Sequence, residues 1–220
     1  MASNPARKPQ DASKAAQAYD AIKGLIASNR LHPGQKLIYR DLERELDMSK
    51  TPIINGLMML EQEGVVHSEK NRGFFMRSVS AAEAAQIYDL RERLENISIE
   101  YAIRNHQPKD LRILAECVRQ YGAHPSSLYD RRRLDLDTAI HMQIARMGRN
   151  DFFSTMIERF YQSIYFRLNV GVLGASIERF ADDHERLLEA IRRKSLAEAK
   201  TILRSHTRAA RKLMLAALGG

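Results

Sequence analysis

The stretch from Gly34 to Met76 constrains the fold of this 220-residue chain more than any other part of the sequence. Leu42 and Leu46 lie one helical turn apart and mark the apolar face of a short helix. Ser49 is a good N-cap for a second helix, whose apolar residues recur at helical spacing until Gly64 ends it. Two short helices joined by a tight turn form a helix-turn-helix, and the first residues of the second helix then face the base edges and phosphates of a DNA major groove. These residues are Ser49, Lys50 and Thr51.

After Gly64 the pattern changes from helical to β-prone. The short runs 65–67 and 74–76 flank a basic, turn-rich tip, which indicates a two-stranded wing. A glycine-tipped wing that carries Lys and Arg can enter a minor groove. Its candidate DNA-contacting residues are Asn71, Arg72 and Gly73. With a helix predicted over 12–29, residues 12–77 are expected to form a winged-helix DNA-binding domain.

The remainder of the sequence reads as helical, so the fold class is mostly α. Residues 1–11 are expected to form a disordered basic arm, and residues 78–80 a linker. Ser80 and Glu83 have the spacing of a capping box at the start of the next helix. Residues 81–217 carry no strand pattern and are predicted to form one antiparallel helical bundle. The predicted helices are 81–105, 109–122, 127–147, 151–172, 176–193 and 195–217.

Composition limits the setting in which the chain works. The net charge of +8 and the sequence pI near 9.7 permit a polyanionic partner such as DNA without proving one. There is no apolar run approaching the ~20 residues of a membrane span, and no signal-peptide pattern. Cys117 is the single cysteine, so no intrachain disulfide can form and a reducing cytoplasm is expected.

Four polar side chains project from apolar helix faces in the predicted bundle. Asp137 and His141 are separated by one helical turn, while His184 and His206 lie at similar distances on either side of the predicted turn at Lys194. If those two helices fold back on each other, the two imidazoles meet at the same level. Three imidazoles and one carboxylate suit zinc, nickel or another divalent transition metal. Spacing alone leaves open whether the histidines are metal ligands or ordinary core residues.

The N-terminal motifs are jointly specific for a known family. The matching residues are Tyr19, Ile22, Pro33-Gly34, Leu37, Leu42, Ser49-Lys50-Thr51-Pro52, Leu57, Leu60, Glu63-Gly64 and Asn71-Arg72-Gly73. Over residues 12–77 the chain thereby resembles the DNA-binding domain of the GntR family of bacterial transcription regulators. The resemblance implies that Arg40, Arg44 and Lys50 contact DNA together with the wing around Gly73. Ile54 departs from the family pattern, because the family usually has a DNA-contacting arginine there.

The helical region carries a second resemblance. Its motifs are Leu90-Arg91-Glu92, Asp137-Thr-Ala-Ile-His141, Gly148-Arg-Asn150, Asp182-Asp-His184-Glu and His206. Over residues 80–217 they are similar to the FCD domain of the FadR subfamily, and six helices resemble its smaller, VanR-like version. In metal-binding members one Asp and three His hold the metal, and these correspond to Asp137, His141, His184 and His206.

The resemblance implies a homodimeric, ligand-responsive regulator of operator DNA, most simply a repressor that a small organic acid releases. A metal with four protein ligands keeps positions open for a carboxylate. Arg91 shares a helix face with apolar residues and is a candidate to pair with that acid, although a surface or dimer-interface role is open. Asn169, with Arg167, is a second candidate for lining the effector cavity.

Two alternatives concern the metal. It could be structural or could itself be the signal, or the cluster could belong to a metal-dependent hydrolase or oxygenase. The sequence holds no His-Glu-x-x-His, Gly-x-Ser-x-Gly or phosphate-loop motif. We therefore expect that the protein is not an enzyme.

Overall fold

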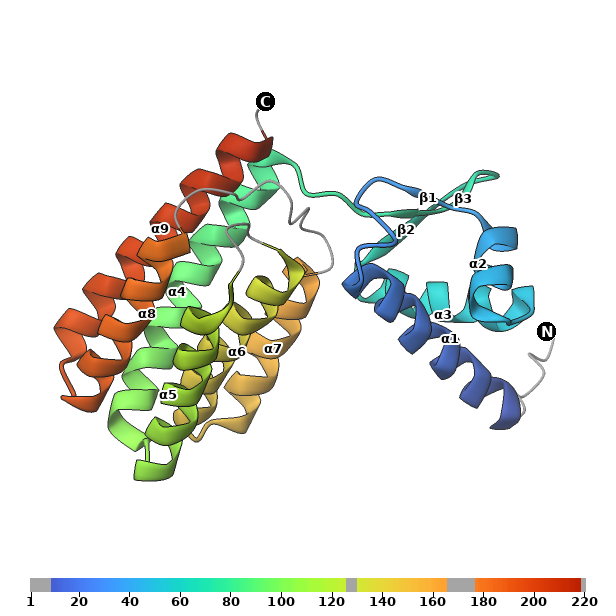
Figure 1. Cartoon of the computed structure of the whole chain (residues 1–220). Coiled ribbons are helices and arrows are strands. Elements are labelled where there is room, and N and C mark those ends of the chain that lie inside the picture. The colour runs from blue at the N-terminus through green and yellow to red at the C-terminus, as the bar shows by residue number, and fades with distance from the viewer. Residues whose placement is uncertain (1–8, 126–129, 166–176, 219–220) are drawn as a thin grey trace, which may run out of the picture. The chain divides into compact units, whose positions relative to one another are not determined.

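The computed structural model describes residues 9–125, 130–165 and 177–218, and the chain divides into two compact units between Ser78 and Val79 (Figure 1). The first unit combines three helices with a small sheet. Its elements are α1 (Pro9–Ala27), β1 (Lys36–Leu37), α2 (Tyr39–Leu46), α3 (Lys50–Gln62), β2 (Val66–Glu69) and β3 (Gly73–Met76). The sheet is antiparallel in the order β1-β3-β2. The predicted winged helix-turn-helix is confirmed, with β1 as a third strand that the sequence did not reveal.

A close approach of α1 and α3 fixes the core of this unit. A Cβ atom at Gly56 on α3 would lie 2.8 Å from the backbone nitrogen of Tyr19 on α1. Since real Cβ atoms do not come so near a backbone atom, only glycine allows this approach. Around it, apolar side chains of the two helices are fully buried. They are Ile22, Ile26, Ile53, Leu57 and Leu60.

Two local predictions for this unit need correction. Helix α1 begins at Pro9 rather than at Ala12, so residues 9–11 of the predicted disordered arm are helical, while residues 1–8 lie outside the described residues. Proline is favoured at a helix start because its missing N–H would have no partner there. Ser49 occupies the N-cap of α3 with an extended backbone, but its side chain makes no capping hydrogen bond.

In its described residues the second unit contains helices and loops but no strands. Its helices are α4 (Ala81–Asn105), α5 (Pro108–Ala123), α6 (Arg131–Met147), α7 (Asp151–Tyr165), α8 (Ile177–Arg192) and α9 (Leu196–Leu218). The hydroxyl of Ser80 accepts a hydrogen bond from the Glu83 backbone nitrogen at 3.2 Å and starts α4, as predicted. The predicted bounds at 127, 172 and 176 fall outside the described residues. Asp130 caps α6 by accepting from the Arg133 backbone nitrogen at 2.8 Å.

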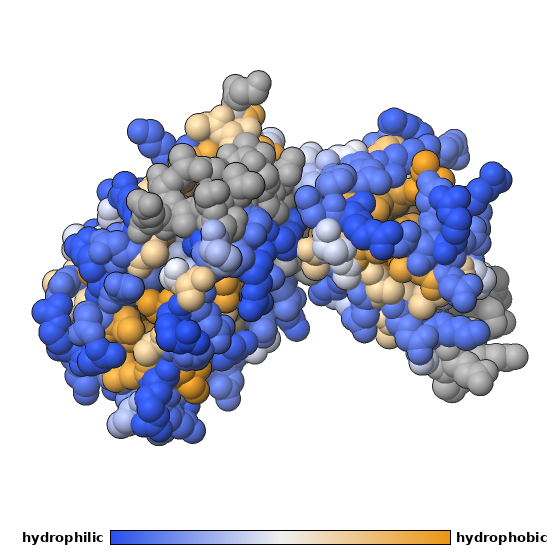
Figure 2. Space-filling model, viewed as in Figure 1, coloured by the Kyte–Doolittle hydropathy of each residue, from blue (hydrophilic) through white to orange (hydrophobic). Residues whose placement is uncertain are grey.

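Five helices of this unit enclose its main apolar core, and a second buried cluster, which includes Phe153 and Ile157, joins α7 to α6. Helix α4 packs against α6 and α9, α5 packs against α6 and α8, and α8 packs against α9 (Figure 1). The core contains fully buried apolar side chains from five helices. Among them are Ile99, Leu114, Tyr121, Ile140, Ile191 and Leu203. Figure 2 shows that hydrophilic residues cover most of the visible surface of each unit. The polar cluster described below therefore lies within an apolar interior.

Candidate metal centre and DNA-binding surface

Helices α6, α8 and α9 bring four ligand-type side chains together inside the helical unit. Asp137 and His141 lie one turn apart on α6, while His184 comes from α8 and His206 from α9. All four are buried, and one ligand atom of each lies within 4.8 Å of the others. The ring centroids of His184 and His206 are 4.7 Å apart, so the predicted meeting of these two imidazoles is confirmed.

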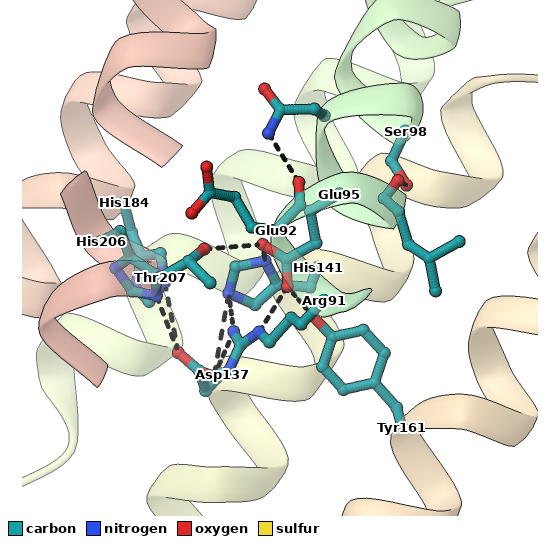
Figure 3. Close-up of polar contacts among 12 residues, drawn as sticks. Arg91, Glu92, Glu95, Ser98, Asp137, His141, Tyr161, His184, His206 and Thr207 are labelled. Carbon is teal, nitrogen blue, oxygen red and sulfur yellow. Dashed lines mark hydrogen bonds and ion pairs between the residues drawn. The ribbon is translucent and has the colours of Figure 1, made fainter. Parts of the chain in front are cut away.

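The Asp137 carboxylate lies between the histidines (Figure 3). Its Oδ1 is 3.3 Å from Nε2 of His184 and 3.8 Å from Nε2 of His206. Its Oδ2 is 3.7 Å from Nε2 of His141. All three imidazoles therefore turn the same nitrogen toward one carboxylate. Three nitrogen donors and one oxygen donor form a ligand set that suits Zn²⁺ and other divalent transition metals.

Two further carboxylates stand behind the imidazoles. Glu95 Oε2 lies 3.4 Å from Nδ1 of His141, and Asp183 Oδ2 lies 3.7 Å from Nδ1 of His206. Histidine ligands of metals usually present their second nitrogen to a carboxylate or a carbonyl, which fixes the ring and its tautomer. The arrangement turns Nε2 of both rings toward Asp137, and Nε2 of His141 also lies 3.0 Å from Nη2 of Arg91.

Buried polar atoms without hydrogen-bond partners show whether the four residues fit a metal ion. Neither ring nitrogen of the buried His184 makes a hydrogen bond of normal geometry among the described residues, and its Nε2 lies 3.3 Å from Oδ1 of Asp137. Such unpartnered buried groups are uncommon and call for an unseen water or ion. A cation bound among the Nε2 atoms and Asp137 would supply the missing partner of His184. The four residues thus fit a metal ion and could bind one.

The electrostatics of the cluster match this requirement. Burial lowers the pKa of His184 to about 4, because the charged imidazolium loses its hydration. Burial alone would raise the pKa of Asp137, but His141, His184 and Arg91 hold it well below its usual range. At neutral pH His184 is therefore neutral and Asp137 is ionised, which are the states in which they bind metal.

Arg91 lies inside this cluster, not on the surface. Only 7% of it is exposed, its Nε donates to Glu95 Oε1 at 2.6 Å, and its Nη2 is 3.5 Å from Asp137 Oδ2. Burial alone would lower the pKa of Arg91, but Glu95, Tyr161 and Asp137 raise it well above its ordinary value, so the guanidinium stays charged. The surface or dimer-interface alternative for Arg91 is wrong. Its contact with an effector stays a prediction, and Asn169 and Arg167 lie outside the described residues.

Several residues around the cluster escaped the sequence analysis. Tyr161 on α7 donates a very short hydrogen bond to Glu95, and the Thr207 hydroxyl donates to the other Glu95 oxygen at 3.4 Å. The spacing of Arg91 and Glu95 by one helical turn was a usable signal for an ion pair. Asp183 gave a weaker sequence signal, because it directly precedes His184 in the chain. Tyr161 and Thr207 gave none, because their contacts depend on how the helices pack.

The DNA-contacting candidates all belong to the first unit, and all but Gly73 are exposed there. Arg44 pairs with Asp41 at 3.1 Å, and Arg72 pairs with Glu69 across the wing turn. The Lys50 ammonium lies 5.1 Å from the centre of the Tyr39 ring at the start of α3. The remaining exposed candidates are Arg40, Ser49, Thr51 and Asn71.

Backbone conformation explains the sequence of the wing tip. Gly73 has a φ of +89°, which favours glycine, and Asn71 has a φ of 64°, which asparagine tolerates better than most residues. Ile54, which departs from the family pattern, is partly buried on α3. No helix in the described ranges is long and apolar enough to cross a membrane.

Known proteins share this combination of units. The helix-turn-helix transcriptional regulator YdhC of Bacillus subtilis is 23% identical over 192 residues, which cover 86% of each chain. The structure of McbR/YncC from E. coli superposes with a TM-score of 0.73 at 20% identity, covering 91% of this chain and 96% of the other. A putative GntR regulator from Rhodococcus superposes with a TM-score of 0.76 at 18% identity, covering 93% and 98%. At these identities the superpositions show the fold alone.

Two family models match the chain, one for each unit. The model of the bacterial regulatory proteins of the gntR family matches residues 14–76, and the model of the FCD domain matches residues 86–209. The match to the FCD domain covers more than half of the 220 residues. The chain is therefore a DNA-binding transcription regulator of the GntR family with an FCD C-terminal domain, and not an enzyme.

Proposed function

We propose that this regulator is a homodimeric repressor whose operator affinity falls when a small organic acid binds beside a metal ion in the helical unit. The observation that carries the proposal is the buried set of Asp137, His141, His184 and His206 with the charged Arg91 in contact with it. The chain would act in the cytoplasm, where its DNA is.

The metal would be held by the three Nε2 atoms and the Asp137 carboxylate, and zinc or nickel suits this donor set best. When bound, such an ion supplies open coordination positions and positive charge that attract a carboxylate. Arg91 offers planar N–H donors next to it, and arginine pairs with carboxylates through two parallel hydrogen bonds. We infer that the effector acid bridges the ion and Arg91.

The DNA would be contacted by the start of α3 and by the wing. Lys50 and Thr51 are exposed at the start of α3, Arg44 is exposed on α2, and all three can reach phosphates or base edges. Two copies related by a twofold axis would place two such units on half-sites about one helical turn apart. An effector bound in the helical unit changes operator affinity only if it binds one arrangement of the dimer better than the other.

In a second candidate function, the regulator binds the metal ion but does not respond to an organic acid. The unpartnered nitrogens of His184 favour a cluster whose ion alone orders the interior, as a structural element or as the signal itself. In this version, removal of the metal changes operator affinity or stability and carboxylates have no effect.

One set of binding measurements separates the two. An operator is first selected from random duplex DNA, and its affinity is then measured with zinc, with chelator, and with a panel of carboxylates under each condition. For the wild type we expect an acid to weaken operator binding only when metal is present. His184→Ala should bind the operator without responding to the acid, whereas the control His106→Ala, which changes an imidazole outside the cluster, should respond normally. A full response of His184→Ala would exclude the metal-linked mechanism.

A further inference from the structure

One contact in the cluster uses the same atom that a metal would need. Nη2 of Arg91 lies 3.0 Å from Nε2 of His141 (Figure 3). Arginine can only donate, so Nε2 of His141 is the acceptor. With Nδ1 of His141 3.4 Å from the Glu95 carboxylate, the proton of the neutral imidazole is assigned to Nδ1, and Nε2 carries the free lone pair.

A ring nitrogen has one lone pair in the plane of the ring. It cannot accept a hydrogen bond from Arg91 and bind a metal ion at the same time. We propose that Arg91 and the metal compete for Nε2 of His141, so that metal binding releases an Arg91 N–H group and this group becomes the donor for the effector carboxylate. The inference rests on the proposed metal site and states how its two ligands are linked.

The net charge of the cluster changes sign when the metal binds. Arg91 carries one positive charge, and Glu95 and Asp137 carry one negative charge each, so these groups sum to −1 before the metal binds. A divalent cation changes the sum to +1. Asp183 is also buried, but Arg179 and Arg186 lie 3.9 Å from its carboxylate on the outer side of α8. The interior therefore repels an anion before metal binding and attracts one afterward.

The donors released in this step point to the chemical class of the ligand. The Nε of Arg91 remains committed to Glu95 at 2.6 Å, which leaves the Nη2 edge for a new partner. One added negative charge restores neutrality. A single carboxylate group at this position, carried on a small molecule, fits both the donor and the charge, whereas a neutral amide of the same shape fits only the donor.

The competition has a measurable consequence for metal affinity itself. Arg91 takes a lone pair from the metal and places a positive charge beside it, so its removal should tighten metal binding when no anion is present. A carboxylate removes both effects, so it should tighten metal binding in the wild type. By linkage, metal must then tighten carboxylate binding by the same factor.

The test measures zinc affinity by competition with a chromogenic chelator, with sodium acetate or with acetamide as its neutral counterpart. For the wild type we expect acetate to tighten zinc binding about tenfold, which is within the usual range of coupling between two sites, and acetamide to have no effect. Arg91→Met should bind zinc more tightly than the wild type without acetate and should gain nothing from acetate. Arg93→Met, an exposed arginine on the opposite side of α4, should behave as the wild type.

A second variant protects the test against misfolding, because Arg91→Met leaves Glu95 buried without its cation. Glu95→Gln keeps Arg91 and should retain the acetate effect, although its zinc affinity falls with the loss of the carboxylate behind His141. The double variant Arg91→Met/Glu95→Gln carries no buried charge pair and should lack the acetate effect. Circular dichroism and thermal unfolding establish that each variant is folded.

The outcomes separate this inference from the proposed function. If zinc does not bind, or binds equally well to His184→Ala, the proposed metal site itself is wrong. If zinc binds at the site and acetate tightens it equally in the wild type and in Arg91→Met, the site stands but the competition does not. Unchanged zinc affinity in folded Arg91→Met without acetate overturns the inference as well.

Discussion

Nε2 of His184 on α8 lies 3.3 Å from Oδ1 of Asp137 on α6, and both side chains are almost completely buried. Residues 47 positions apart in the sequence thus form the shortest of the three contacts between this carboxylate and the histidines. Because the carboxylate is ionised and the imidazole neutral, both groups are in the states that bind a metal cation, whereas protonation of the imidazole is unfavourable. Protonation of His184 would place a charge in an interior that excludes water.

The stability of the metal-free protein should therefore fall in mild acid. The pKa of His184 is about 4 in the folded protein and 6.5 in an unfolded chain, so the unfolded state takes up this proton first as the pH falls. The contribution of His184 to the free energy of unfolding is fully present above about pH 6.5. It falls as the pH decreases toward about 4, and the total loss from this group is roughly 3 kcal/mol. Chemical unfolding in chelator across this range measures the loss. His184→Gln has no such proton, so a slope as steep as that of the wild type would contradict the assignment.

The carboxylate behind His206 should control metal affinity from a distance. Asp183→Asn removes a negative charge 3.7 Å from Nδ1 of His206 and should weaken zinc binding about 10- to 100-fold, as such changes usually do. Asp182 is its exposed neighbour and pairs only loosely, with Arg186 at 3.8 Å. Asp182→Asn should leave zinc affinity unchanged in the same chelator competition. Equal effects of the two variants would mean that net charge, and not the contact with His206, decides the affinity.

The sequence was sufficient to place all four candidate ligands because their positions depend on simple helical geometry. Asp137 and His141 share a face by their spacing, and Lys194, with a φ of 56°, ends α8 so that α9 folds back beside it. The meeting of His184 with His206 follows from that hairpin. The winged helix was predictable for a similar reason, since its caps and glycines mark each boundary.

The surroundings of the cluster could not be predicted in this way. In addition to the local bond from Arg91, Glu95 receives hydrogen bonds from Tyr161, 66 positions away, and from Thr207, 112 positions away. No periodicity in a single sequence encodes which helix faces which across such distances. The strand β1 was missed because two residues, Lys36 and Leu37, form it, and their pairing with Phe74 and Phe75 on β3 is the only sign of it.

Two glycines of the first unit should respond to the same substitution in opposite directions. Gly56→Ala forces a Cβ against the Tyr19 backbone at 2.8 Å and should destabilise the unit by about 1–3 kcal/mol, because backbone atoms cannot move aside cheaply. Gly24 on α1 has nothing within 4 Å of an added Cβ, so Gly24→Ala should stabilise by about 0.5–1 kcal/mol through helix propensity. Thermal unfolding of the full chain gives both values. Stabilisation by Gly56→Ala would contradict the close approach of α1 and α3.

The DNA-binding surface of the first unit can be tested at Lys50. Lys50 is exposed at the start of α3, and we propose that it contacts a phosphate, an interaction that is electrostatic and independent of DNA sequence. Lys50→Ala should weaken binding to operator and to unrelated duplex DNA alike, and should reduce the slope of log affinity against log salt by about one. Lys109→Ala removes the same charge from an exposed position on α5 of the other unit. Its slope should match that of the wild type, so a reduced slope in both variants would assign the effect to overall charge instead of to a contact at Lys50.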